Sequence, residues 1–137
     1  MKLSKQLSKT MTQNLCPCES SKPYNTCCER YHNGLAAPTA EALMRSRYTA
    51  FAMGLESYLL QTWHPKTRPA RLNLNEDPPT KWLGLQVKHT ETTSEITATV
   101  AFVARYKVAG KAERLHELSQ FERIEGFWYY LAGSYVA

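Results

Sequence analysis

The chain has 137 residues, of which 43% are hydrophobic and 11% aromatic, so one ordinary domain can form its own core without a disulfide framework. A formal net charge of +5 tolerates anionic partners but does not require them, so nucleic acid is not the expected main partner. Because no apolar run is long enough for a secretory signal or a membrane span, we expect a cytoplasmic protein with reduced thiols and no membrane contact.

The first segment, residues 1–14, is a polar arm whose charges are all basic: Lys2, Lys5 and Lys9. We expect a flexible arm or a short helix here. A nucleic-acid contact through this arm and the cysteine cluster that follows it is a third-ranked hypothesis. It predicts binding that weakens steeply as salt is added.

All four cysteines of the chain lie within the stretch CPCESSKPYNTCC at residues 16–28, as Cys16, Cys18, Cys27 and Cys28. Four thiolates this close in sequence can converge on one tetrahedral Zn²⁺ ion. Adjacent cysteines are poorly placed to bond to each other. We therefore predict a structural zinc site in preference to free thiols or disulfides, with no open position for catalysis. His32 is the alternative to Cys28 as a ligand, although we interpret it as a surface histidine.

The strongest helical pattern covers residues 35–65. Thr39 is the predicted N-cap of a first helix that ends near Gly54, and a second helix is stopped by Pro65. One face of these helices is apolar and contains Met44, Tyr48, Phe51, Leu55 and Tyr58.

After a proline-rich loop at residues 66–80, the hydrophobic period changes from helical to alternating. The alternation predicts four strands, at residues 81–89, 95–107, 113–124 and 127–133. In the first of them, Leu83 and Leu85 are expected to share one face. Helices followed by strands predict an α+β fold in which the helices pack on a curved antiparallel sheet.

The cysteine stretch resembles the SEC-C zinc motif, C-P-C-G-S-G-x-x-Y-x-x-C-C/H, which occurs at the C-terminus of the SecA translocation ATPase and in many small bacterial proteins. Glu19 and Ser21 stand where the motif has glycines, so residues with a Cβ must adopt the turn. By this resemblance, export or translation machinery is the kind of partner to consider. The partner is otherwise unnamed.

The remainder of the chain resembles the YchJ family of bacterial proteins, through stretches such as LMRSRYTAFAMGLESYLLQTWHP and HELSQFERIEGFWYYLAG. This resemblance implies an NTF2-like cone after the SEC-C motif. The expected organisation is therefore a basic arm at 1–14, a SEC-C-like zinc knuckle at 15–34 and an NTF2-like domain at 35–137. Longer relatives carry a second SEC-C motif, whereas this sequence has one.

An NTF2-like cone often has an open pocket between its helices and its sheet, and several residues are candidates to line it. Arg47 falls close to the apolar helical face, and Glu117 lies on a half-buried strand face, so we predict that the two form an ion pair. Further candidates at the mouth are Trp63, His64, Trp82, Arg105 and Trp128. For all five a structural role is the simpler interpretation, with Trp82 and Trp128 as core aromatics and His64 as a helix C-terminal cap.

Enzyme signatures such as HExxH, GxSxG and a glycine-rich phosphate loop are absent from the sequence, so an enzyme is not favoured. The leading interpretation is a zinc-binding adaptor whose knuckle contacts a protein partner. The alternative is a small-molecule-binding or catalytic NTF2-like domain. An apolar patch beside the knuckle would favour the former, and a polar cavity with converging side chains the latter. The oligomeric state is left open, with a dimer among the options.

Overall fold

The computed structural model describes residues 14–136 and has the expected α+β architecture. Four antiparallel strands form one sheet in the order β1–β2–β3–β4. The strands are β1 (Thr80–Thr92), β2 (Thr97–Val108), β3 (Lys111–Ile124) and β4 (Phe127–Tyr135). The basic arm expected at residues 1–14 lies, except for its last residue, outside the described part of the chain.

The longer predicted helix begins and ends at its predicted caps, whereas the second ends at Gln61 and does not extend to Pro65. The helical elements are the 3₁₀ turn η1 (Tyr24–Thr26), α2 (Cys28–His32), α3 (Ala40–Met53) and α4 (Glu56–Gln61). The Thr39 side chain accepts a hydrogen bond from the Ala42 amide at 3.0 Å, and Gly54 ends α3 in the left-handed conformation at a φ of 73°. Every helix between residues 14 and 136 is too short or too polar to cross a lipid bilayer.

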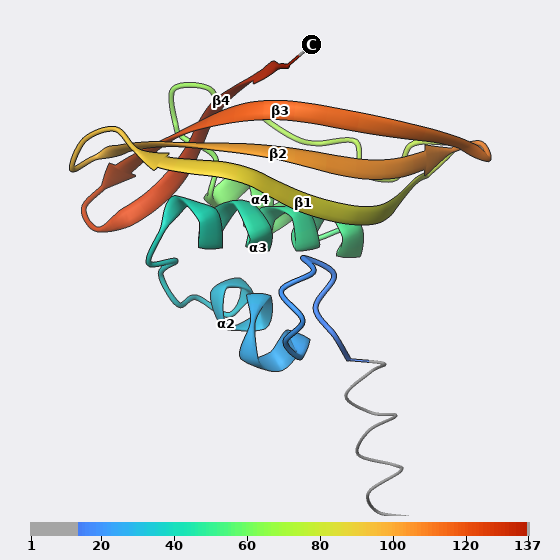
Figure 1. Ribbon diagram of the computed structural model, residues 1–137, viewed down its shortest axis with the longest axis horizontal. Coiled ribbons are helices and arrows are strands. Elements are labelled where there is room, and N and C mark those ends of the chain that lie inside the picture. Colours follow the sequence, from blue (N-terminus) through green and yellow to red (C-terminus); the bar gives the residue numbers. More distant parts are fainter. Residues whose placement is uncertain (1–13, 137) are drawn as a thin grey trace, which may run out of the picture.

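Helix α3 lies between the two other parts of the structure (Figure 1). The sheet packs against one side of it, while α2 and the cysteine stretch lie on the other side. One continuous cluster of buried side chains joins all three parts, and it includes the four cysteines, Leu43 and Met44 of α3, and Phe121 of β3. The cysteine stretch is therefore packed into the main core.

The strand faces follow the predicted alternation only in part, because Val103 of β2 is buried between Phe102 and Ala104 and the pairing of β1 is irregular. On β2, alternate residues Ala98, Val100, Phe102 and Ala104 are buried, as expected. In β1 the pairing shifts between Trp82 and Gly84, so Leu83 is an extra residue without a partner on β2. Leu83 is consequently 45% exposed, and the expectation that it shares a face with buried Leu85 was wrong.

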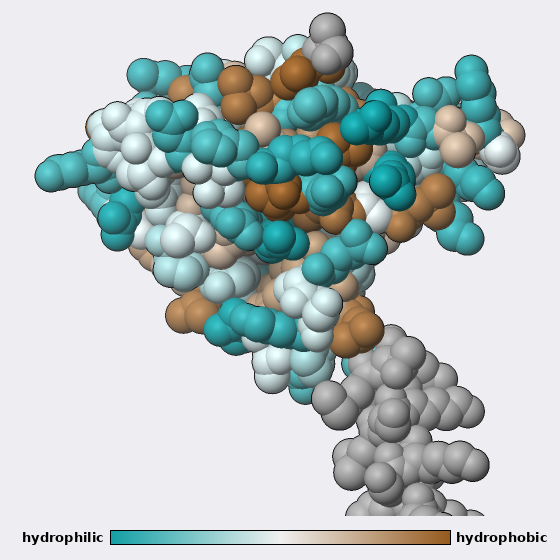
Figure 2. All heavy atoms as spheres, in the orientation of Figure 1, coloured by the Kyte–Doolittle hydropathy of each residue, from teal (hydrophilic) through white to brown (hydrophobic). Residues whose placement is uncertain are grey.

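Figure 2 shows that polar residues cover much of one face of the molecule. Apolar residues reach the surface on both sides of the lower part of this view, where Figure 1 places α2 and the cysteine stretch. The exposed large hydrophobic side chains are Leu15, Leu35, Met53, Leu83, Ile96, Phe127, Tyr135 and Val136.

Candidate metal centre and adjoining cavity

The four cysteine side chains converge on one point. Their sulfur atoms all lie within 4.8 Å of one another, all four residues are buried, and none is in a disulfide. The Sγ atoms of Cys18 and Cys27 are 3.6 Å apart, and those of Cys27 and Cys28 are 4.0 Å apart. A tetrahedral ion with metal–sulfur bonds of about 2.3 Å separates its ligands by about 3.8 Å. The cluster could therefore hold one metal ion.

A tight hairpin brings the two ends of the cysteine stretch together. Leu15 and Pro23 form an isolated antiparallel bridge, and the Cys16 amide donates a hydrogen bond to the Lys22 carbonyl at 2.9 Å. Glu19 and Ser21 have positive φ angles of 64° and 68°. The inference that side-chain-bearing residues adopt this glycine-type turn is confirmed.

Hydroxyl groups surround the sulfur atoms. The Ser20 hydroxyl lies 3.1 Å from the sulfur of Cys27. The buried Thr49 hydroxyl of α3 lies 3.4 Å from the sulfur of Cys28 and 3.6 Å from that of Cys16. Such contacts orient metal ligands and stabilise their ionised form.

The thiols also interact strongly with one another. The hydrogen bond with Cys18 lowers the pKa of Cys16, and the same interaction raises the pKa of Cys18 to about 11. Hydrogen bonding to Cys16 likewise raises the pKa of Cys28. In the absence of a cation the cluster thus shares protons among its sulfurs, and a bound metal ion would replace those protons.

His32 stands outside the four-sulfur cluster and has a structural role. Its Nε2 lies 2.9 Å from the Ser46 carbonyl, which can only accept, so Nε2 carries the proton. Nδ1 then accepts from the Tyr24 hydroxyl at 2.7 Å. The ring is half-buried, and its edge meets Tyr58. The interpretation of His32 as a surface histidine was therefore wrong, because it links the cysteine stretch to α3.

Two further side chains attach the cysteine stretch to the rest of the molecule. Arg45 of α3 donates to the Cys18 carbonyl at 2.7 Å while pairing with Glu41 one turn earlier. The Glu19 carboxylate accepts a hydrogen bond from the Leu85 amide on the edge strand β1 at 3.2 Å. Sequence reasoning missed both contacts, since neither leaves a signal in residue spacing.

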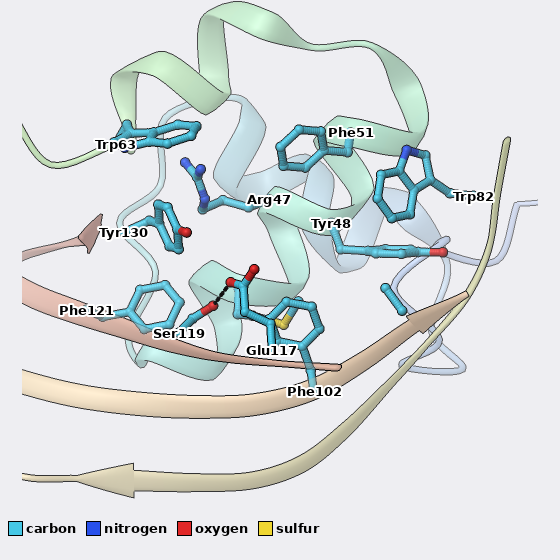
Figure 3. A pocket seen from close by; sticks show the side chains of 12 residues that line it. Arg47, Tyr48, Phe51, Trp63, Trp82, Phe102, Glu117, Ser119, Phe121 and Tyr130 are labelled. Carbon is cyan, nitrogen blue, oxygen red and sulfur yellow. Dashed lines mark hydrogen bonds between the residues drawn. The ribbon is translucent and has the colours of Figure 1, made fainter. Parts of the chain in front are cut away.

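A cavity of about 250 Å³ lies between α3 and the sheet (Figure 3). Four of the predicted pocket residues line it, namely Arg47, Trp63, Trp82 and Glu117. Most of the remaining wall is aromatic and comes from Tyr48, Phe51, Phe102, Phe121 and Tyr130. None of these five was predicted as a pocket residue.

Arg47 is buried, as its position on the helical wheel predicted, but its partners differ from the expected one. Its Nη1 donates to the Leu59 carbonyl at 2.8 Å and to the Thr62 hydroxyl at 2.6 Å. The guanidinium carbon lies 5.0 Å from the ring centre of Trp63 and 4.7 Å from that of Tyr130. Burial lowers the pKa of Arg47 to about 10, so it remains a cation at neutral pH.

The predicted Arg47–Glu117 ion pair is not formed. Within residues 14–136 no salt bridge joins these two side chains, because the end of α4 supplies the acceptors for Arg47. Glu117 instead accepts a hydrogen bond from the Ser119 hydroxyl. The two opposite charges nevertheless line the same cavity without touching.

The structure places three predicted pocket residues away from this cavity. His64 is buried, and its Nε2 donates to Glu122 at 3.0 Å. Its Nδ1 accepts a hydrogen bond from the Lys66 amide, so the ring proton is on Nε2.

Arg105 is exposed because it follows Ala104 on the strand and points to the opposite face of the sheet. Trp128 is buried near α2, in a hollow that Tyr31 and Leu43 also line.

Comparison with known proteins identifies relatives of both parts of the chain. The family model described as "YchJ, middle NTF2-like domain" matches residues 39–133. A UPF0225 protein of Chromobacterium violaceum is 54% identical over 131 residues, which are 92% of this chain and 96% of that protein. A UPF0225 protein of Bordetella pertussis is 53% identical over 121 residues, covering 86% of this chain and 90% of the relative.

Two solved structures are similar throughout most of their length. The solution structure of a SEC-C motif containing protein from Rhodopseudomonas palustris has a TM-score of 0.78 at 32% identity, covering 89% of this chain and 98% of that one. The crystal structure of a SEC-C motif containing protein from Psychrobacter arcticus has a TM-score of 0.75 at 32% identity, covering 89% and 82%. The expected SEC-C motif and NTF2-like fold are thus confirmed.

Proposed function

This chain belongs to the YchJ family, and we propose that it is a zinc-dependent binding protein whose cysteine stretch and adjoining sheet edge contact a protein partner. The SEC-C knuckle, residues 15–34, would supply the metal centre. The NTF2-like domain would act as the scaffold on which the knuckle is held.

Zinc is the metal that the donor set favours. Four buried cysteine sulfurs are soft ligands, and their spacing suits tetrahedral coordination. Four protein ligands complete that coordination, which supports a structural ion and not a catalytic one. Bound zinc would keep Cys16, Cys18, Cys27 and Cys28 ionised and hold the knuckle in one conformation.

The observation that carries the binding function is an apolar hollow beside the knuckle. Leu15 of the knuckle and Leu83 of β1 are each 45% exposed, and both line this hollow together with Pro17, Tyr48 and Trp82, while Glu19 and Ser21 supply its polar part. Exposed apolar side chains that cluster in this way are typical of protein contacts. The hollow spans the junction that zinc would stabilise, so its shape depends on the metal centre.

The class of partner rests on analogy alone. The SEC-C motif also occurs in the SecA translocation ATPase, so export or translation machinery is the first place to look. A protein partner accounts for the exposed position of Leu83, which results from an irregularity of β1 that places an apolar side chain at the surface.

A capture experiment from the native host tests this function with matched variants. The wild-type chain, Leu83→Ser and Ile96→Ser are compared, because Leu83 and Ile96 are similarly exposed but Ile96 lies beyond the other end of β1. We expect Leu83→Ser to lose a partner that the wild type and Ile96→Ser retain, at equal zinc content. A Cys27→Ser/Cys28→Ser variant should lose the same partner. Identical partners for all four proteins would refute the proposal.

A further inference from the structure

We propose that the cavity between α3 and the sheet binds a small zwitterion with a flat apolar body, of the size of an aromatic amino acid. This cavity shares Tyr48 and Trp82 with the hollow beside the knuckle, but the charged residues Arg47 and Glu117 do not line that hollow, so substitution of Glu117 tests the inference separately from the protein-binding function. It rests on two opposite charges, Arg47 and Glu117, that line one aromatic cavity without contacting each other.

Part of the Arg47 guanidinium group is available to donate hydrogen bonds to a ligand. Within the described chain only its Nη1 donates to protein acceptors, which leaves Nε and Nη2 without such bonds. Neither nitrogen is among the fully enclosed atoms that lack a partner, so each keeps some exposed surface, although Arg47 as a whole is only 5% exposed. Trp63 and Tyr130 hold the guanidinium carbon at 5.0 and 4.7 Å, which fixes its plane. A carboxylate can be bound by such a fixed pair of donors.

The carboxylate of Glu117 is held in place on the opposite wall. The Ser119 hydroxyl donates to its Oε2, and between residues 14 and 136 no cationic side chain forms a salt bridge with it. A Cβ added at Gly133 would overlap this carboxylate and would lie 2.9 Å from the Tyr130 hydroxyl. Glycine therefore makes room for the charged group, whose free oxygen can accept from an ammonium group.

Aromatic rings line the cavity beside the two charges, as Figure 3 shows. Trp82 lies 5.7 Å from Tyr48 and 5.8 Å from Phe51, measured between ring centres. Rings at these angles offer flat surfaces for an apolar body. The volume of about 250 Å³ is below the roughly 300–1,000 Å³ typical of drug-sized ligands, which indicates a smaller molecule.

Charge balance selects a zwitterion over a simple ion. The cavity carries one cation and one anion, so a purely anionic ligand would leave Glu117 unpaired and would repel it. A purely cationic ligand would do the same to Arg47. A molecule with a carboxylate for Arg47 and an ammonium group for Glu117 satisfies both, and its apolar remainder packs against the aromatic wall.

Three probes with the same phenyl group test this choice: L-phenylalanine, 3-phenylpropanoate and phenethylamine. Binding to the full-length, zinc-loaded protein is measured by calorimetry and by NMR of the Trp63 and Trp82 indole N–H groups. We expect phenylalanine to bind about tenfold more tightly than either singly charged probe. Equal binding of all three probes, or no response of the indole signals to phenylalanine, tyrosine or tryptophan, would overturn the proposal.

Two matched substitutions locate the site. Glu117→Gln keeps the side-chain shape but removes the charge, and we expect about tenfold weaker binding of phenylalanine without weaker binding of 3-phenylpropanoate. Glu122→Gln removes a carboxylate that pairs with His64 outside the cavity, and it should leave both affinities unchanged. Urea unfolding of each variant confirms that it is folded. An unchanged phenylalanine affinity in folded Glu117→Gln would place any binding elsewhere.

Discussion

Thr49 is the residue of α3 that contacts the sulfur atoms of the candidate metal centre, because its hydroxyl lies beside those of Cys16 and Cys28. Thr49→Val keeps the shape and removes the hydroxyl. We expect metal affinity to fall by about 10–100-fold, the usual cost of losing a group that supports a ligand. Competition with a chromophoric zinc chelator measures the change. Thr49→Ser retains the hydroxyl and should stay within a few-fold of wild type, whereas equal losses in both variants would show that packing alone matters.

Gly133 has a specific steric role on the inner face of β4. Gly133→Ala would force its Cβ into the Glu117 carboxylate, so we expect a loss of about 1–3 kcal/mol in the free energy of unfolding, measured with urea. Gly84→Ala is the control, since its Cβ would make an ordinary contact 3.5 Å from the Glu19 carboxylate. If the two substitutions lower the free energy of unfolding equally, steric overlap with Glu117 does not explain the loss in Gly133→Ala.

For individual residues, the sequence predicted which side chains are buried better than it predicted their hydrogen-bond partners. The four cysteines were assigned as one cluster because their spacing allows little else, and the helical wheel correctly predicted that Arg47 is buried. The partner of Arg47 was wrong, because a helical wheel gives the direction of a side chain but not its reach to the end of α4. Likewise His64 meets Glu122, from a strand that the sequence analysis did not connect to it.

At the scale of elements, Glu19 joins the knuckle to the edge strand. Its carboxylate accepts from the Leu85 amide, which the sheet itself leaves free on that side of β1. Glu19→Ala should therefore speed hydrogen exchange at Leu85, measured by NMR, while Glu19→Gln keeps an acceptor oxygen and should preserve protection. Unchanged exchange in Glu19→Ala would mean that this contact does not hold the junction in solution.

The two ends of α3 and the positions of the strands were predictable, whereas the end of α4 at Gln61 and the irregularity of β1 were not. Thr39 and Gly54 bound α3 as expected, since capping depends on residues next to each other in sequence. The shift at Leu83 depends on how β1 pairs with β2, and alternation alone carries no information about pairing. The exposed apolar residue that supports the binding function therefore came from the structure.

Burial raises the pKa of four tyrosines, Tyr24 among them, so their ionisation opposes folding at high pH. Burial raises the pKa of Tyr48, Tyr58 and Tyr130 from 10 to about 12. Between pH 10 and pH 12 these tyrosines are deprotonated in the unfolded chain but still protonated in the folded chain. Their contribution to the free energy of unfolding is therefore fully present below pH 10 and is lost as the pH rises towards 12. Arg47, with its pKa lowered to about 10, has the opposite effect but is a single group.

We therefore expect the free energy of unfolding to fall over this alkaline range. Urea titrations at several pH values, with tyrosinate absorbance recorded in parallel, measure the loss. Tyr48→Phe should make the decline shallower. A free energy of unfolding that is constant or rises above pH 10 would contradict the assignment of these tyrosines.

The central claim for the whole molecule is that zinc, bound by four cysteines, holds the knuckle in a core shared with α3 and the sheet. X-ray absorption at the zinc edge of the purified protein tests it most directly. The account predicts one zinc per chain with four sulfur ligands at about 2.3 Å. A first shell containing nitrogen or oxygen, or a preparation without stoichiometric zinc, would contradict it.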